Sequence, residues 1–252
     1  WIGQPKATAA ATILKDLNPD SEVVPTVQFL NPGNVTELVK DADLVLDCAD
    51  SFAASYILSD TCFDQNTPLI SASALGLAGY VGGFCGGAPS LRAVFPDLPD
   101  RAASCATAGV LGPVVGVIGS MQAQMALSVL LGMSPSPLGQ LVQFDAASFR
   151  SSGFRFDNAP EPTDTPFRFI TPAQIKPNDF VVELRDLDEA PDPVCTQALR
   201  NEVTDFGPDG PMPKEDQRTV MCCKSGLRAW QAATRLNEVW DGRIVLVTLG
   251  NS

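Results

Sequence analysis

The sequence predicts an α/β protein made of two successive units. Strand-like and helix-like segments alternate through the first part of the chain, a polar and proline-rich stretch interrupts them, and a shorter alternation follows. Strands that alternate with helices form parallel sheets with right-handed crossovers. We therefore expect a first domain at residues 1–150, a linker at 151–166 and a smaller α/β domain at 167–252.

The first unit begins with a predicted helix at 5–19, where Pro5 suits the first helical position and Asn18-Pro19 ends the helix. The elements expected after it are a strand at 21–30, a helix at 34–42, a strand at 43–49, a helix at 51–65, a strand at 67–76, two strands within 79–95 around the Gly86-Gly87 turn at a sheet edge, a helix from about residue 113, and a strand at 138–146. In the second unit we expect a short helix at 170–175, strands at 179–186, 218–223 and 243–250, and a helix at 226–240.

Residues 102–144 contain no charged side chain, and the helix predicted within them is long enough to cross a bilayer. Its glycines, Pro113, Gln122 and Gln124 make it a poor lipid-facing helix, so we expect a central helix buried by protein on all sides and no membrane span.

Composition excludes several classes of function. The formal net charge of -12 and the pI near 4.3 oppose binding to nucleic acid or anionic lipid. The absence of histidine excludes imidazole catalysis and His-ligated metal sites. Seven cysteines without a CxxC spacing argue against a disulfide scaffold and a four-thiolate zinc site, and they suit a reducing cytoplasm. The N-terminus has no secretory signal and no initiator Met, so we expect the chain to begin within a longer protein.

Two carboxylates follow the apolar run that begins at Leu44. Asp47 ends this run and Asp50 comes three positions later. Because open α/β sheets bind ligands at the carboxyl ends of their strands, this position favours a ligand-binding role for Asp50.

Four ordered segments resemble one family: GQPKATAA, LVLDCADSF, SCATAGVLGPVVGVIGSMQA and QLVQFDA. Residues 1 to about 150 are similar in this way to the ThiF/MoeB/HesA proteins, the bacterial relatives of ubiquitin-activating enzymes. The resemblance implies a Rossmann-like adenylating domain that uses ATP and magnesium to adenylate the C-terminal glycine of a ubiquitin-like sulfur carrier of the ThiS/MoaD type. It also implies a homodimer, to which the apolar helix from residue 113 could contribute.

The resemblance assigns roles to individual residues. Lys6 matches a phosphate-contacting lysine, Asp50 matches the aspartate that handles magnesium, and Ser51 stands where relatives commonly have Asn beside the nucleotide. Alternatives from the residues alone are a solvated Lys6 and an N-capping Asp50. Cys105 matches a cysteine that acts covalently in some relatives and is dispensable in others.

Two family features have no counterpart in this sequence. No GxGxxG occurs, so we expect the chain to lack roughly the first βαβ unit and, alone, to have little adenylation activity. Ser90 and Ala93 occupy the places of a first CxxC pair, and no cysteine lies between Cys105 and Cys195, so we expect no zinc. Cys48, Cys62 and Cys85 are interpreted as small buried hydrophobic residues.

The segment RTVMCCKSGLRAW resembles the active-site loop of rhodanese-type sulfurtransferases, and ITPAQI and VVELRD resemble the opening of that fold. Backbone N–H groups of a tight loop at a helix N-terminus, aided by Arg228 and Lys224, can stabilise a thiolate or persulfide. Cys223 is therefore the candidate sulfur carrier, and Cys222 is expected to be buried. The usual histidine-bearing loop is absent.

Together these features predict adenylation of a sulfur carrier coupled to sulfur transfer from a persulfide donor, for thiamine, molybdopterin or related cofactor synthesis. The alternatives are a non-catalytic carrier-docking protein with a degenerate rhodanese domain, and a fragment of a nucleotide-binding dehydrogenase. The dehydrogenase hypothesis leaves SCATAGVLGP and CKSGLR unexplained.

Overall fold

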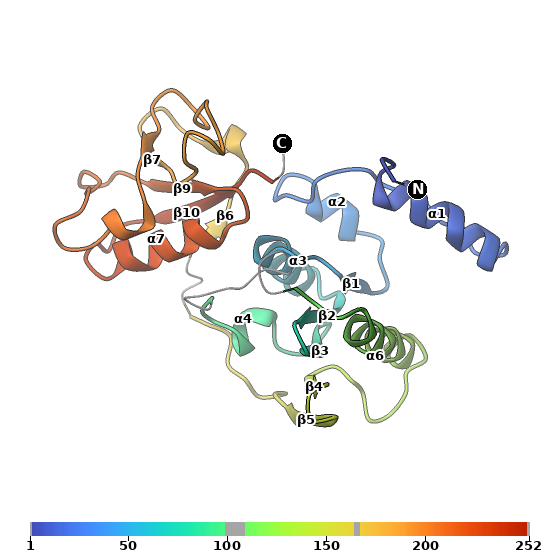
Figure 1. Cartoon of the computed structure of the whole chain (residues 1–252). Coiled ribbons are helices and arrows are strands. Elements are labelled where there is room, and N and C mark those ends of the chain that lie inside the picture. The colour runs from blue at the N-terminus through green and yellow to red at the C-terminus, as the bar shows by residue number, and fades with distance from the viewer. Residues whose placement is uncertain (1, 99–108, 164–166, 251–252) are drawn as a thin grey trace. The chain divides into compact units, whose positions relative to one another are not determined.

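The computed structural model describes residues 2–98, 109–163 and 167–250 (Figure 1). The chain divides into a small unit, Trp1–Leu30, and a large unit, Asn31–Ser252. The small unit contains helix α1 (Lys6–Leu17), on which no residue is buried. The strand predicted at 21–30 is absent: this segment pairs with no strand in the described part of the chain, and Val24 is 75% exposed. Its β-type composition does not suffice, because a strand is stable only when paired.

The large unit contains a five-stranded sheet with the order β1-β2-β3-β4-β5. Its strands are β1 (Val45–Asp47), β2 (Pro68–Leu75), β3 (Ala78–Cys85), β4 (Gln140–Asp145) and β5 (Arg150–Arg155). Strands β1 and β2 are parallel and are connected through α3 (Phe52–Asp64), whereas all later neighbours are antiparallel. Helix α2 (Val35–Val39) precedes β1. The sheet is thus mixed, and the predicted parallel character holds only for its first pair.

Two predictions about this sheet were wrong in detail. The hairpin joins β2 to β3 around Gly76, whose φ of +59° suits glycine, and β3 lies between β2 and β4 rather than at an edge. The second strand expected before residue 95 is instead the short helix α4 (Leu91–Val94), capped by Ser90. Strand β5 also occupies part of the expected linker, because Arg150–Arg155 pairs along its whole length with β4.

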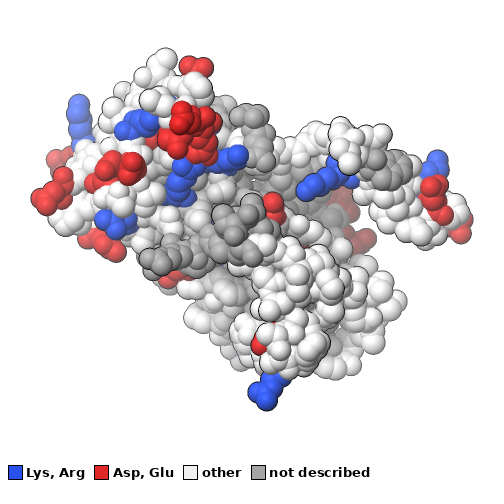
Figure 2. Space-filling model, viewed as in Figure 1, with Lys and Arg blue, Asp and Glu red and all other residues white. Residues whose placement is uncertain are grey.

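Helix α6 (Gly112–Leu130) packs on β2 and β3 through one face only. Its buried residues, spaced by four positions, are Val114, Ile118, Gln122 and Ala126. Ile118 approaches Gly79 of β3 so closely that an added Cβ would lie 2.7 Å from its side chain. The opposite face is apolar and exposed, which corrects the expectation of burial on all sides: Leu127 is 53% exposed and Leu130 is 56% exposed. The surface of α6 carries no charge (Figure 2).

Among the described residues, α6 is the one helix that is long and apolar enough to span a membrane. Since its buried face is packed on a sheet, length and composition are weak grounds for a membrane role.

A second five-stranded sheet follows, with the order β6-β10-β9-β7-β8, and all its pairs are parallel. Its strands are β6 (Arg168–Phe169), β7 (Phe180–Glu183), β8 (Leu199–Arg200), β9 (Thr219–Cys223) and β10 (Ile244–Thr248). The accompanying helices are η1 (Pro172–Gln174), η2 (Val203–Asp205) and α7 (Leu227–Asn237). Strands β7, β9 and β10 are nearly continuous apolar runs, as expected for a sheet covered on both faces. The predicted α/β class is confirmed.

Candidate functional site

The two carboxylates after β1 have opposite environments. Asp47 is 1% exposed, and its carboxylate accepts hydrogen bonds from Ser71 Oγ at 2.7 Å and from the backbone N–H of Ala49 at 3.1 Å. Asp47 and Ser71 are register partners on β1 and β2, so this bond lies within the sheet. Asp50 is exposed, and no ion pair or hydrogen bond joins its side chain to another of the described residues. Asp47 is therefore structural, and Asp50 is the carboxylate available to a ligand.

Gln122 of α6 holds the carboxyl end of β1. Its Nε2 donates to the carbonyl oxygens of Asp47 at 2.8 Å and Ile70 at 3.0 Å, and its Oε1 accepts from Cys48 Sγ at 3.5 Å. A buried side-chain amide with this many partners orders the backbone that it binds. Gln122 thus positions the start of the loop that carries Asp50. Cys48 itself is exposed, which contradicts its interpretation as a buried hydrophobic residue; Cys62 and Cys85 are buried.

Ser51, not Asp50, is the N-cap residue of α3, and its side chain caps no backbone N–H of this helix. The alternative of an N-capping Asp50 is therefore not supported. Instead, Ser51 Oγ donates to the carbonyl oxygen of Ser225 at 3.3 Å. Ser225 lies two residues after Cys223, in the loop between β9 and α7.

Cys223 is the last residue of β9 and is fully buried. Its Sγ accepts hydrogen bonds from the backbone N–H groups of Gly226 at 3.1 Å and Ala229 at 3.3 Å. Gly226 has a φ of +90° and is the N-cap residue just before α7, so the loop turns tightly enough to direct these N–H groups at the sulfur. The loop thus directs backbone N–H groups at the sulfur, and this sulfur has no solvent contact.

Burial raises the pKa of the Cys223 thiol above its ordinary value. The hydrogen bonds from Ala229 and Gly226 and the positive charge of Arg228 lower this pKa, but burial outweighs them. Burial and the charge of Glu183 also raise the pKa of Cys222. Cys222 is buried as predicted and belongs to the apolar core beside Val220 and Val247.

The two cations of the loop differ in their contacts. Arg228 Nη2 lies 2.7 Å and 2.6 Å from the two carboxylate oxygens of Glu189. The side chain of Lys224 is exposed, while its carbonyl oxygen accepts hydrogen bonds from Thr248 Oγ1 at 2.8 Å and Gly250 N at 3.0 Å. The loop backbone is therefore fixed by residues at the end of β10.

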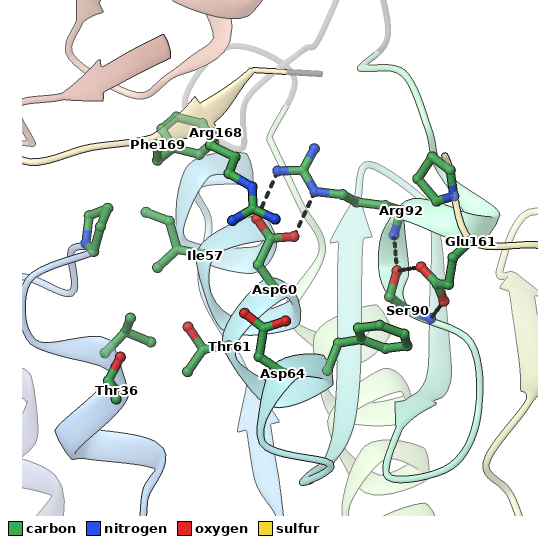
Figure 3. A pocket seen from close by; sticks show the side chains of 14 residues that line it. Thr36, Ile57, Asp60, Thr61, Asp64, Ser90, Arg92, Glu161, Arg168 and Phe169 are labelled. Atoms are coloured by element: carbon green, nitrogen blue, oxygen red, sulfur yellow. Dashed lines mark hydrogen bonds and ion pairs between the residues drawn. The ribbon is translucent and has the colours of Figure 1, made fainter. Parts of the chain in front are cut away.

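A pocket of about 260 Å³ lies beside α3 and is lined by residues of α2, α3, α4, β6 and the segment after β5 (Figure 3). Arg92 is 3% exposed and forms a two-point ion pair with Asp60 on one side of it. Glu161 accepts hydrogen bonds from the backbone N–H and the hydroxyl of Ser90, each at 2.6 Å. Asp50, Ser51 and Cys223 do not line this pocket.

These two pairs were not predicted from the sequence, because neither a buried Arg in a four-residue helix nor a Glu in an expected linker belongs to a periodic pattern. The Ser90–Glu161 pair falls where a first CxxC pair and the region of a second would lie. Among the described residues, no group of three or more acidic or cysteine side chains could hold a metal ion.

Two predicted site residues cannot be joined to this geometry. Lys6 is the exposed first residue of α1, in the small unit. Cys105 lies outside the described residues. The structure therefore brings together Asp50, Ser51 and the Cys223 loop within the large unit, through the contact of Ser51 with Ser225.

Comparison with solved structures supports the fold. The chain is similar to Escherichia coli MccB crystallised with ATP, with a TM-score of 0.53, 17% identity, and coverage of 65% of this chain and 51% of that one. It is also similar to PaaA, with a TM-score of 0.50, 20% identity, and coverage of 62% and 48%. At these identities the likeness concerns the fold alone.

Curated relatives are closer in sequence. The adenylyltransferase and sulfurtransferase MOCS3 of Bos taurus is 43% identical over 147 residues, which are 57% of this chain and 32% of that protein. MOCS3 of Drosophila sechellia is 39% identical over 149 residues, or 58% and 33%. The chain thus spans about a third of the length of these relatives. The ThiF family matches residues 1–165, and with this match covering well over half of the sequence, the chain belongs to the ThiF family.

Proposed function

We propose that the protein adenylates the C-terminal glycine of a ubiquitin-like sulfur carrier and transfers sulfur to it from Cys223. Membership of the ThiF family and the relatives named adenylyltransferase and sulfurtransferase support both activities in general. The observation that carries the proposal is the hydrogen bond of Ser51 Oγ to the carbonyl oxygen of Ser225. This hydrogen bond joins the loop proposed to bind nucleotide to the loop proposed to carry sulfur. Both proposed steps act on the same carrier C-terminus, so the two loops need to lie close together.

In the adenylation step, an oxygen of the carrier carboxylate attacks the α-phosphorus of ATP and pyrophosphate leaves. Both reactants are anionic, so the site must neutralise charge and hold the groups in line. Asp50 fits a magnesium ligand because its exposed carboxylate has no partner within the described chain, and magnesium commonly takes one or two protein carboxylates with water and phosphate oxygens. Bound magnesium would neutralise phosphate charge.

Ser51 and Lys6 are proposed as further nucleotide contacts on the family resemblance alone. Ser51 lies next to Asp50, and its hydroxyl oxygen can still accept a hydrogen bond while its proton is donated to Ser225. Lys6 is an exposed cation of the small unit. Cys105 is proposed as a covalent attachment point for the carrier, again from that resemblance.

In the sulfur-transfer step, Cys223 carries a persulfide loaded by a persulfide donor. The terminal sulfur attacks the carbonyl carbon of the acyl-adenylate, a C–S bond forms, and AMP leaves with the electron pair of the broken C–O bond. A second thiol then reduces the resulting acyl disulfide, which yields the carrier thiocarboxylate and a new disulfide. The backbone N–H groups of Gly226 and Ala229 suit the persulfide anion that this step requires.

The proposal includes a homodimer and a cytoplasmic setting. The exposed apolar face of α6, which includes Val115, Leu127 and Leu130, supports burial against a second copy. No nucleic acid or membrane has a role in it, since the chain is strongly acidic.

Thiosulfate:cyanide sulfurtransferase assays on paired variants test the sulfur half. We expect Cys223→Ala to lose transfer at least about 100-fold, as is usual when a covalent nucleophile is removed. Cys222→Ala, the matched control in the same strand, should keep most of the rate. Equal rates for the wild type and Cys223→Ala would remove Cys223 from the mechanism.

The complete burial of Cys223 specifically favours one competing function, a non-catalytic carrier-docking protein. Carrier binding that persists in a chain without Cys223-dependent transfer would support that alternative.

A further inference from the structure

The ion pair between Arg228 and Glu189 lies beside the sulfur loop. Arg228 belongs to the first turn of α7, five residues after Cys223, and Glu189 lies in the connection that follows β7. Since β7 and β9 are parallel neighbours, the connections after both strands begin at the same edge of the sheet. The two side chains are 36% and 24% exposed, so the pair lies at the surface of this edge and is partly accessible to solvent.

The backbone around Glu189 is fixed by several contacts. Glu189 N donates to Asp186 Oδ1 at 2.7 Å, and Ala190 N donates to the carbonyl oxygen of Asp186 at 3.0 Å. Arg200 from β8 donates to the carbonyl oxygens of Arg185 and Ala190. Glu189 is therefore held in a closed turn and is not a freely moving surface acid.

Both ends of this connection are also anchored in the protein interior. The carboxylate of Glu183, which is fully buried, accepts hydrogen bonds from Arg185 Nε at 2.9 Å and Nη2 at 2.7 Å. The same carboxylate accepts from Val194 N at 3.0 Å. The position of Glu189 opposite Arg228 is consequently part of the fold.

We infer that Glu189 determines the specificity of the sulfur site by occupying Arg228, so that the site disfavours small dianionic sulfur donors and accepts persulfides of low charge. The inference rests on the proposed sulfur-carrier function of Cys223. Arg228 is the guanidinium whose charge acts on this sulfur, and its Nη2 is already bound to both Glu189 oxygens. Asp186, Asp188 and Asp192 add negative charge to the same connection.

The two donor classes differ in the charge that the site must accept. With thiosulfate, the Cys223 thiolate attacks the sulfane sulfur of a dianion; a new S–S bond forms, the old one breaks, and sulfite leaves with its electron pair. With a persulfide R–S–SH, the thiolate attacks the terminal sulfur of a neutral group, and RS⁻ leaves with a single charge. Only the first donor requires a free cation to offset like-charge repulsion from Glu189.

The variant Glu189→Gln tests the inference, and Asp188→Asn is its matched control. Asp188 is an adjacent, exposed carboxylate without a hydrogen bond or ion pair in the described structure. Each substitution removes one negative charge from the same turn. For Glu189→Gln we expect the KM for thiosulfate to fall about tenfold, with kcat unchanged or raised. Asp188→Asn should change KM by less than about twofold, as for an exposed charge.

A second measurement does not need an acceptor. After incubation with thiosulfate, the gain of one sulfur on the peptide that contains Cys223 is measured by mass spectrometry, and Glu189→Gln should load at lower thiosulfate concentration than the wild type. Loading from a cysteine-desulfurase persulfide should be equal in both proteins. Equal KM shifts in both variants, no shift in Glu189→Gln, or no loading of either protein by thiosulfate would each overturn the inference.

The failure of the inference and that of the proposed function are distinguishable. If Cys223→Ala abolishes transfer while Glu189→Gln behaves as the wild type, only the role of Glu189 is lost. Thermal melting of each variant, with Glu189→Asp as a charge-preserving variant, identifies any loss that comes from unfolding.

Discussion

Arg92 of α4 and Asp60 of α3 form a two-point ion pair, with Nε 2.6 Å from Oδ1 and Nη2 2.9 Å from Oδ2. The same guanidinium lies 4.9 Å from the ring centroid of Tyr56 and 5.6 Å from that of Trp230 on α7. A planar, delocalised cation can satisfy a carboxylate along its edge and aromatic rings on its faces at the same time.

We expect Arg92→Ala to lower the free energy of unfolding by about 1.5–3 kcal/mol, because it removes two charge-assisted hydrogen bonds to the partly exposed carboxylate of Asp60. Urea denaturation measures this change. Arg150→Ala, on the exposed edge strand β5, is the control and should stay within about 0.5 kcal/mol of the wild type. A loss of the same small size in both variants would show that the Arg92–Asp60 pair does not stabilise the fold.

A second prediction concerns Ser90 and Glu161, which join the start of α4 to the segment after β5 through two hydrogen bonds of 2.6 Å. Hydrogen bonds to a charged group contribute about 1.5–3 kcal/mol. We expect Ser90→Ala and Glu161→Gln each to destabilise the protein. A double-mutant cycle should give a coupling energy of at least about 1 kcal/mol. If the two substitutions destabilise the protein additively, Ser90 and Glu161 do not stabilise it through a direct interaction. Because no zinc is expected in this region, a metal chelator should leave the melting temperature unchanged.

A third prediction concerns the pH dependence that Glu183 imposes. Burial by itself would raise the pKa of Glu183, but hydrogen bonds and the charge of Arg185 outweigh it, so the pKa lies below the ordinary 4.5. A carboxyl whose pKa is lowered by folding stabilises the folded state above its unfolded pKa, and this contribution is lost as pH falls through the folded pKa.

We therefore expect the unfolding free energy of the wild type to decline more steeply below about pH 4.5 than that of Glu183→Gln. At neutral pH the variant should be about 3–5 kcal/mol less stable, since Arg185 is left buried without its carboxylate partner. Chemical denaturation between pH 3 and pH 7, with Asp188→Asn as a control for general charge effects, gives both quantities. Parallel curves for the wild type and Glu183→Gln would refute the assignment.

A fourth prediction concerns Asp50. If its carboxylate binds magnesium with a nucleotide, Asp50→Asn should weaken the magnesium-dependent part of ATP binding by about tenfold, equivalent to about 1.4 kcal/mol. Asp43→Asn is a matched control, because Asp43 is also exposed but lies before β1 rather than after it. Isothermal titration with and without magnesium makes the comparison, and equal affinities for the two variants would sink the assignment.

Local patterns in the sequence predicted most of the fold of the large unit. The sequence correctly identified the apolar strands β1, β2, β4, β7, β9 and β10 and the helices α3 and α7. It also correctly placed Asp47 at the end of a strand, Asp50 in the loop after it, and a tight loop after Cys223. In each case a few neighbouring residues decide the conformation, since a strand, a tight turn or a helix start is a local preference.

Other features depended on contacts between distant segments. The segment at 21–30 has the composition of a strand but pairs with no strand among the described residues, and β5, although polar, is a strand because β4 pairs with it. The exposed apolar face of α6 could not be distinguished from its buried face by composition, because the whole helix is uncharged.

The sequence by itself determined the α/β class, the family resemblance and the candidate reactive groups, Asp50 and Cys223, because a motif is a pattern of neighbouring residues. Only the tertiary structure decided which groups are free to act. The carboxylate of Asp47 accepts a hydrogen bond from Ser71, Arg228 forms an ion pair with Glu189, and Cys223 is buried. Availability depends on burial and on partners far away in the chain, which no local pattern specifies.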